Sequence, residues 1–329
     1  TLDIGELMLE PSKAGVDRLL DLFHSRASKY TSLHSGMKQV ETIYDGEFIV
    51  SISDMDKNEK AAVPNLLRQG VDQMAGRVAS VVPQVFFASE DPGKRAADRR
   101  AVTAARAIQG WWEADRLPLK TKTRARYLVA YGMAPAVVVY DPKEKRPSWS
   151  VRKPMECFPS PQHITGESTP EDVIFAYRRS ARWLIDRGYG AVLGSVTGQA
   201  LSRIQPDTLF MLLEYIDRDC HALAITGTVS PSGAQIMDPT GINRSDWLAW
   251  VPNPTGMMNA VVPSRLTLGK SGGQFDSMIA MYYMQSRLMA LEVAGVEKGV
   301  FPDMWLVSRA GEMVNIIDGP HDGRSGKIN

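Results

Sequence analysis

Apolar residues in the first third of the chain recur every three or four positions, which is the spacing of one helix face. The helices that this pattern predicts lie at 4–9, 16–23, 63–81 and 94–116, with a further helix that ends at Tyr131. Residues 36–52 alternate between apolar and polar instead. Ile43, Phe48, Val50 and Ile52 are the apolar residues of this alternation. They surround an Asp45-Gly46 turn and therefore predict a β-hairpin.

After Gly132 the hydrophobic period changes from that of a helix to that of strands. The β-branched run 136–140 ends at Asp141-Pro142, which is a strand followed by a turn. Further strands are predicted at 149–152, 173–177, 209–215 and 221–226, with a short helix at 183–187. Two more short strands are predicted near the end of the sequence, at 304–307 and 313–317. This mixture predicts an α+β fold.

Residues 274–298 contain no proline and predict a helix roughly 35–40 Å long. One apolar stripe of this helix contains Phe275, Met278, Ile279, Tyr282, Met289, Val293 and Val296, and a second contains Met281, Met284, Leu288 and Leu291. A helix that is apolar nearly all round is buried on several sides or lies in a membrane. Asp276, Arg287, Glu292 and Lys298 interrupt the apolar run, which excludes a membrane span. The sequence therefore predicts that this helix is buried against copies of itself, in a ring or bundle.

The composition is typical of a globular chain. The sequence has 329 residues, which at about 150 per domain indicates about two domains. The formal net charge is only +1, which weighs against a free-standing protein that binds nucleic acid by neutralising phosphates. Cys157 and Cys220 are the two cysteines, too few for a disulfide scaffold, so a reducing compartment is expected. The sequence starts without Met and ends in a glycine-rich stretch, so we expect a fragment trimmed at one or both ends.

Positive charge is concentrated between Lys94 and Arg126. This segment contains ten basic and three acidic residues, an excess of seven positive charges. It is either a solvated helix face that pairs with acids of a neighbouring subunit or a nucleic-acid surface near Trp111 and Trp112. We favour the first interpretation because both tryptophans fall on the apolar stripe and are expected in the core.

The residue patterns of common enzyme sites are missing, so no catalytic, cofactor or metal site is predicted. The five histidines, His24, His34, His163, His221 and His321, have no metal-ligand spacing. Gly269-Lys270-Ser271 resembles the end of a phosphate-binding loop, but Ser264 stands where that motif needs glycine. Gly326-Lys327 has the same defect. No nucleophile elbow occurs, and acid pairs such as Glu171-Asp172 fit turns.

The order of elements carries a resemblance to a known family. The relevant stretches are the helix at 65–73 with 78–85, the helix-to-strand passage at 128–142, and the loop, long helix and Gly299-Val300-Phe301-Pro302 stop within 262–307. Together they resemble the portal, or head–tail connector, proteins of tailed double-stranded DNA bacteriophages. The chain departs from that family in two ways. It stops inside the expected clip, and its loop at 269–274 is longer than the family's tight turn.

The resemblance implies a portal-like α+β fold in four segments: a mainly helical part of the wing at 1–131, a mixed wing at 132–268, a stem helix at 269–299 and the beginning of the clip at 300–329. It also implies a dodecameric ring at one capsid vertex of the virion, assembled in the host bacterial cytoplasm. Double-stranded DNA would pass through the ring during packaging and ejection. The implied partners are the terminase large subunit, the major capsid and scaffolding proteins, and head-completion adaptor proteins.

The same resemblance suggests positions that contact DNA or the clip. Gln285, Arg287 and Glu292 are candidates for exposed positions of a helix that lines or braces the channel. Lys298 and Arg309 are candidates for phosphate contact, with salt bridges between subunits as an equal alternative. Two other functions stay open: another ring or adaptor protein of a virion, and a nucleic-acid-processing enzyme that uses the basic region 94–126.

Overall fold

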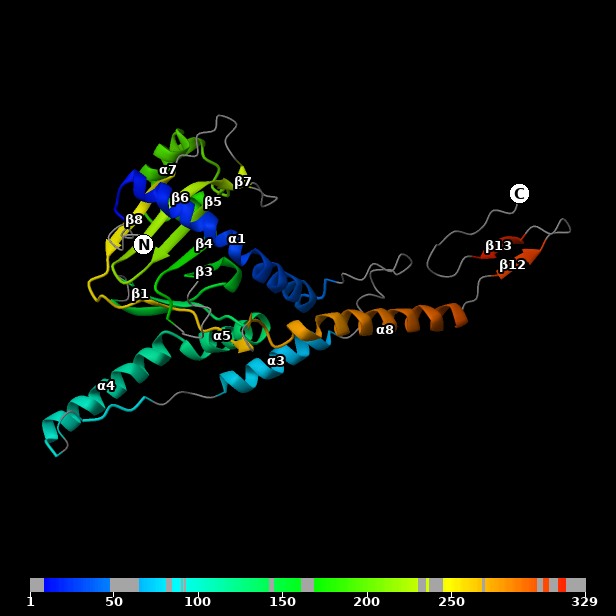
Figure 1. Cartoon of the computed structure of the whole chain (residues 1–329), viewed down its shortest axis with the longest axis horizontal. Coiled ribbons are helices and arrows are strands. Elements are labelled where there is room, and N and C mark those ends of the chain that lie inside the picture. Colours follow the sequence, from blue (N-terminus) through cyan, green and yellow to red (C-terminus); the bar gives the residue numbers. More distant parts are fainter. Residues whose placement is uncertain are drawn as a thin grey trace. The chain divides into compact units, whose positions relative to one another are not determined.

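The computed structural model is a mixed α+β structure (Figure 1). It describes residues 9–47, 65–80, 85–89, 91, 93–141, 145–160, 169–229, 235–236, 245–267, 270–300, 304–307 and 313–317. The chain forms two compact units. The first contains Thr1–Met37 and Ala75–Gly273, and the second contains Lys38–Met74 and Gln274–Asn329. The division into wing, stem and clip stays a prediction.

An antiparallel six-stranded sheet forms the core of the first unit. Its strands are β3 (Cys157–Pro159), β4 (Val173–Ser180), β5 (Leu209–Ile216), β6 (Cys220–Val229), β7 (Gln235–Ile236) and β8 (Asp246–Pro252), in the order β3-β4-β5-β6-β7 with β8 also paired to β6. Val173, Ile174 and Phe175 of β4 are fully buried. Because successive strand residues point to opposite faces, this run shows that the sheet is covered on both sides.

Helix α1 (Lys13–Tyr44) packs its N-terminal part on this sheet. The ring of Phe23 meets Phe158 edge to face, with 5.1 Å between the ring centroids. The indole nitrogens of Trp247 and Trp250 donate to the carbonyl oxygens of Ser12 and Leu9, at 2.9 and 3.1 Å. These bonds fix the start of α1 against β8. The short helices α6 (Ala181–Asp186) and α7 (Gly190–Thr197) pack against β4 and β8.

A smaller sheet and two helices also belong to the first unit. β1 (Ala136–Asp141) pairs with β2 (Arg146–Val151) and β9 (Ala260–Val261). Helices α4 (Arg95–Ala114) and α5 (Leu117–Tyr131) precede β1, as the sequence predicts. Gly132 ends α5 with φ 73°, and a Cβ there would lie 2.1 Å from the carbonyl oxygen of Gly272. Only glycine fits at this position, and its left-handed conformation ends the helix there.

The predicted β-hairpin at 36–52 is wrong. Residues up to Tyr44 belong to α1, and Asp45-Gly46 is the turn that ends this helix. Met37, Val40 and Ile43 are buried at helical spacing, so the apolar residues before the turn form one face of a helix. Phe48, Val50 and Ile52, the other apolar residues of the predicted hairpin, lie outside the described residues.

Helix α3 (Leu66–Ala79) forms within the range 63–81 that the sequence predicts. Leu66 and Val78 are exposed. The buried residues are Leu67, Val71 and Ala75, four positions apart. Because i, i+4 neighbours lie on one helix face, this row is the buried side of α3.

The second unit contains the last part of α1, the beginning of α3, and α8 (Ile279–Val300). The side chain of Asn65 donates to the carbonyl oxygen of Ile43 at 2.6 Å and accepts from the N–H of Arg68 at 2.9 Å. It therefore caps the start of α3 and holds it at the end of α1. A 3₁₀ turn at Asp276–Met278 precedes α8, so the helix begins five residues later than predicted. Strands β12 (Met304–Val307) and β13 (Met313–Ile317) pair antiparallel and confirm the predicted bounds.

Candidate interaction surfaces

One face of α8 exposes a row of large apolar side chains. Met281, Met284, Leu288 and Leu291 are 63%, 69%, 60% and 50% exposed. They are the second of the two stripes in the sequence and are called the α8 stripe below. Tyr282 and Met289, from the other predicted stripe, are half-buried, and Ser286 is buried. The chain therefore covers one side of α8 and leaves the α8 stripe uncovered, and such an apolar row indicates an interaction surface.

Three of the predicted site residues flank the α8 stripe. Gln285, Arg287 and Glu292 are all exposed. At 100° per residue, Gln285 and Glu292 lie on one side of the stripe and Arg287 on the other, so they do not form one cluster. Lys298 lies in α8, but its side chain is outside the described part, and Arg309 is outside the described residues.

The basic region 94–126 does not present all its charges to solvent. Lys94 forms an ion pair with Asp91. The guanidinium of Arg124 lies 5.0 Å from the ring centre of Trp149, and its Nε donates to the carbonyl oxygen of Ala134 at 3.2 Å. Exposed arginines remain along α4 and at its end: Arg95, Arg99, Arg100, Arg106 and Arg116. Part of the positive charge in the region 94–126 is thus paired with groups of the first unit.

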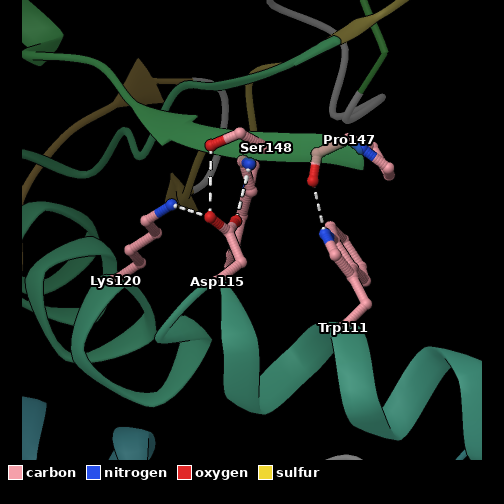
Figure 2. Close-up of polar contacts among 6 residues, drawn as sticks. Trp111, Asp115, Lys120, Pro147 and Ser148 are labelled. Atoms are coloured by element: carbon pink, nitrogen blue, oxygen red, sulfur yellow. Dashed lines mark hydrogen bonds and ion pairs between the residues drawn. The ribbon is translucent and has the colours of Figure 1, made fainter. Parts of the chain in front are cut away.

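Figure 2 shows how the corner between α4 and α5 is held against β2. The carboxylate of Asp115 accepts from Lys120 Nζ at 2.7 Å, from the Ser148 hydroxyl at 3.1 Å and from the Trp149 N–H at 2.8 Å. Burial by itself raises the pKa of Asp115, but these donors outweigh it and lower the pKa below its ordinary value. Arg116, the next residue, has φ 53°, an uncommon conformation for a residue other than glycine. The Asp115 carboxylate therefore links the end of α4 to both α5 and β2.

The two tryptophans of α4 have different environments. Both are half-buried, so the prediction that they lie in the core holds only in part. The indole nitrogen of Trp111 donates to the carbonyl oxygen of Pro147 at 2.6 Å. The indole nitrogen of Trp112 is buried and has no acceptor among the residues that the structure describes. Trp111 thus anchors α4 to β2, whereas Trp112 belongs to a groove on another side of α4.

This groove, called the α4 groove below, has a volume of about 610 Å³. It is lined by Val85, Phe86, Val102, Ala105, Arg106, Ile108, Gln109, Trp112, Glu113 and Pro118. The side chain of Phe86 is 82% exposed and that of Val102 is 51% exposed. This groove is not predictable from the sequence, because 85–89 is irregular and gives no periodic signal.

Two buried groups of charged side chains lie at the main sheet. Arg26 donates to Asp172 at 2.8 Å and to the carbonyl oxygen of Phe158 at 3.2 Å, and both charged side chains are largely buried. Burial raises the pKa of Asp172, and Arg26 offsets this rise only in part. The carboxylate of Glu214 pairs with Arg152 at 2.7 Å and lies 2.8 Å from His221 Nε2. These partners outweigh burial, so the pKa of Glu214 is lowered.

The charged side chains of these two groups are paired with one another. Each lies within the sheet core, where charged partners satisfy one another and fix side-chain positions. Burial raises the pKa of the Cys157 thiol well above its ordinary value and that of Cys220 to about 12, so neither thiol is an activated nucleophile. Among the described residues, no group of three or more His, Cys, Asp or Glu side chains could hold a metal ion.

No helix within the described part of the chain has the length and apolar character needed to cross a membrane. The sequence matches no model of a known protein family, and a search of curated proteins gives no match either.

Proposed function

We propose that this protein is the structural subunit of a portal ring, the channel for double-stranded DNA at one vertex of a bacteriophage capsid. The observation that carries the proposal is the exposed α8 stripe on an unbroken helix of 22 residues. Copies of the chain that pack around a common axis would cover this stripe, and identical neighbours make closed symmetric assemblies the expected outcome.

The order of elements also supports the proposal. The described helices α3 and α5, the Gly132 bend into β1, and α8 followed by β12 stand in the sequence order of the portal family's wing, stem and clip. We assign 1–131 and 132–268 to the wing, 269–299 to the stem helix and 300–329 to the start of the clip. Docking of the terminase large subunit, head-completion adaptor proteins and the capsid and scaffolding proteins belongs to the same proposal, with the virion as its location.

The charge balance suits a conduit. A wall that neutralised many phosphates would hold duplex DNA tightly and oppose its movement, whereas the net charge of this chain is +1. The proposal assigns no catalytic role to the chain and leaves the energy for DNA movement to a separate motor protein. Gln285, Arg287 and Glu292 on α8, together with Lys298 and Arg309, are the proposed channel or clip contacts.

Electron microscopy of the purified protein tests the proposal. We expect end-on views of rings with an open centre, and analytical ultracentrifugation should give one large species of defined mass. A centre too narrow for duplex DNA would favour another ring or adaptor protein of a virion. Monomers at every concentration tested would refute both ring-forming functions.

A second candidate, a nucleic-acid-processing enzyme, rests on the exposed arginines of α4. It predicts tight DNA binding by the monomer with a steep dependence on salt, because each phosphate contact releases counterions. Fluorescence anisotropy with a labelled duplex across a salt series distinguishes the two functions. Weak binding with a small salt slope eliminates the enzyme.

A further inference from the structure

The α4 groove has no occupant among the residues that the structure describes. Seven of its ten lining residues are apolar, and Phe86 and Val102 are more than half exposed. A concave apolar site edged by a few charged side chains fits the apolar face of a helix. The question is which helix could fill it.

The groove side of α4 and the α8 stripe have the same spacing. Val102, Ala105, Gln109 and Trp112 follow one another at intervals of three, four and three residues. Met281, Met284, Leu288 and Leu291 repeat those intervals on α8. Each row covers about 15 Å of helix. Rows with this alternation of three and four residues interlock when two helices pack side by side at roughly 20°.

The charges beside the two rows are complementary. Arg106 and Glu113 flank the row on α4, and both are exposed. Arg287 and Glu292 flank the α8 stripe and are exposed as well. In heptad packing, a parallel arrangement brings Arg287 beside Glu113, and an antiparallel arrangement brings Arg106 beside Glu292. Either direction pairs opposite charges.

We propose that the α8 stripe of one copy packs into the α4 groove of a neighbouring copy. The inference rests on the proposed function for the association of copies, and it goes further by naming the two surfaces that meet. Because groove and stripe are different surfaces, the contact is heterologous and passes from copy to copy until a ring closes. Phe86 and Trp112 supply the aromatic side chains that commonly dominate such interfaces.

Disulfide cross-linking between two variants that each gain one surface cysteine tests the contact. Gln109→Cys and Leu288→Cys place one thiol at the middle of each row, while the native Cys157 and Cys220 are buried and stay in place. We expect an equimolar mixture of the two full-length variants to give a cross-linked dimer on a non-reducing gel after mild oxidation. Each variant alone, at the same total concentration, should give at least tenfold less dimer.

Two controls make this experiment decisive. Val251→Cys is similarly exposed, on β8 away from the groove, and its mixture with Leu288→Cys should give no dimer above background. A chain that carries both Gln109→Cys and Leu288→Cys should form cross-linked ladders. A compact cross-linked monomer instead would show that α8 fills the groove of its own chain, and it would overturn the proposal.

A charge exchange gives a second readout. Reversing the flanks of α4 with Arg106→Glu and Glu113→Lys keeps the net charge and should weaken self-association about threefold to tenfold. Reversing those of α8 with Arg287→Glu and Glu292→Lys should do the same. Combining all four substitutions should restore the wild-type association constant by analytical ultracentrifugation, whereas additive weakening would overturn the pairing.

Failure of this inference is distinguishable from failure of the proposed function. If the wild-type protein forms rings but neither Gln109→Cys nor Ala105→Cys, which faces residue 288 in the antiparallel arrangement, gives a dimer with Leu288→Cys, the ring uses other surfaces and only the pairing is wrong. If the wild-type protein forms no assembly, the portal function itself is refuted.

Discussion

Strand β5 and helix α8 contain similar apolar residues, but those of β5 are buried and several of those of α8 are exposed to solvent. Leu212 and Leu213 of β5 are fully buried between the layers of the first unit, whereas Leu288 and Met284 of α8 are 60% and 69% exposed. The sheet completes its core within one chain. The helix keeps an apolar row that only another surface can cover. One region therefore determines the stability of the single chain, and the other is the surface through which we propose that the chain associates.

The sharpest test of this contrast applies one substitution in both regions. Leu212→Ala removes a fully buried side chain and should lower the free energy of unfolding by about 3–5 kcal/mol, because the sheet core cannot close the resulting cavity. Leu288→Ala should change it by less than about 0.5 kcal/mol in the dilute single chain. Urea unfolding followed by tryptophan fluorescence measures both. Equal effects would show that α8 is packed within its own chain.

The buried pair Arg26–Asp172 tests how much the sheet core depends on internal partners. Arg26→Met leaves the carboxylate of Asp172 buried without its cation and should cost about 3 kcal/mol. The double variant Arg26→Met with Asp172→Leu removes both charges and should recover most of that loss. Chemical denaturation of both variants checks the prediction. A double variant that is less stable than the single one would show that the pair is worth more than apolar packing.

Association should respond to changes on α8 that leave folding intact. Met284→Ser, in the centre of the α8 stripe, should weaken self-association by about 1–2 kcal/mol per contact while the unfolding midpoint of the single chain stays within error. Met257→Ser is the matched control because Met257 is 68% exposed but lies outside the stripe. Sedimentation velocity over a concentration series measures the effect. Identical weakening by both variants would argue against a specific surface.

The smallest expected effect concerns the corner between α4 and α5. Asp115→Asn keeps the shape of the side chain but loses the charge that pairs with Lys120, and should cost about 1 kcal/mol near neutral pH. The pKa of Asp115 is lowered in the folded chain, so its stabilisation is present above about pH 4 and is lost as the pH falls further. The difference between wild type and variant should therefore shrink from pH 6 to pH 3 in thermal unfolding. A constant difference would exclude the ion pair as its cause.

Elements with a clean hydrophobic period were predictable from the sequence. α4, β1, β5 and the β12–β13 pair lie where the pattern places them, because their apolar residues repeat at one period without competing signals. The segment 36–44 was misassigned, since a few apolar residues before an Asp-Gly turn fit both a strand and the last turns of a helix. Strand β8 was not predicted at all.

The surfaces were predictable only in part. The sequence contains the α8 stripe as a pattern, but which stripe the chain covers depends on packing that no local pattern records. The α4 groove depends on Phe86, in an irregular segment, lying beside residues of α4 that are more than fifteen positions away. The ion pair of Lys120 with Asp115 likewise follows from the turn at Arg116 and not from charge spacing alone.

The close crossing of Gly132 and Gly272 limits how this chain can vary. The backbone of residue 272 occupies the space where any side chain at 132 would begin, and the positive φ of Gly132 excludes most residues a second time. The lack of space for a Cβ atom and the positive φ are thus two independent reasons why position 132 needs glycine. In a set of natural variants, position 132 should therefore be among the slowest to change, even though glycine has no side chain that could carry chemistry.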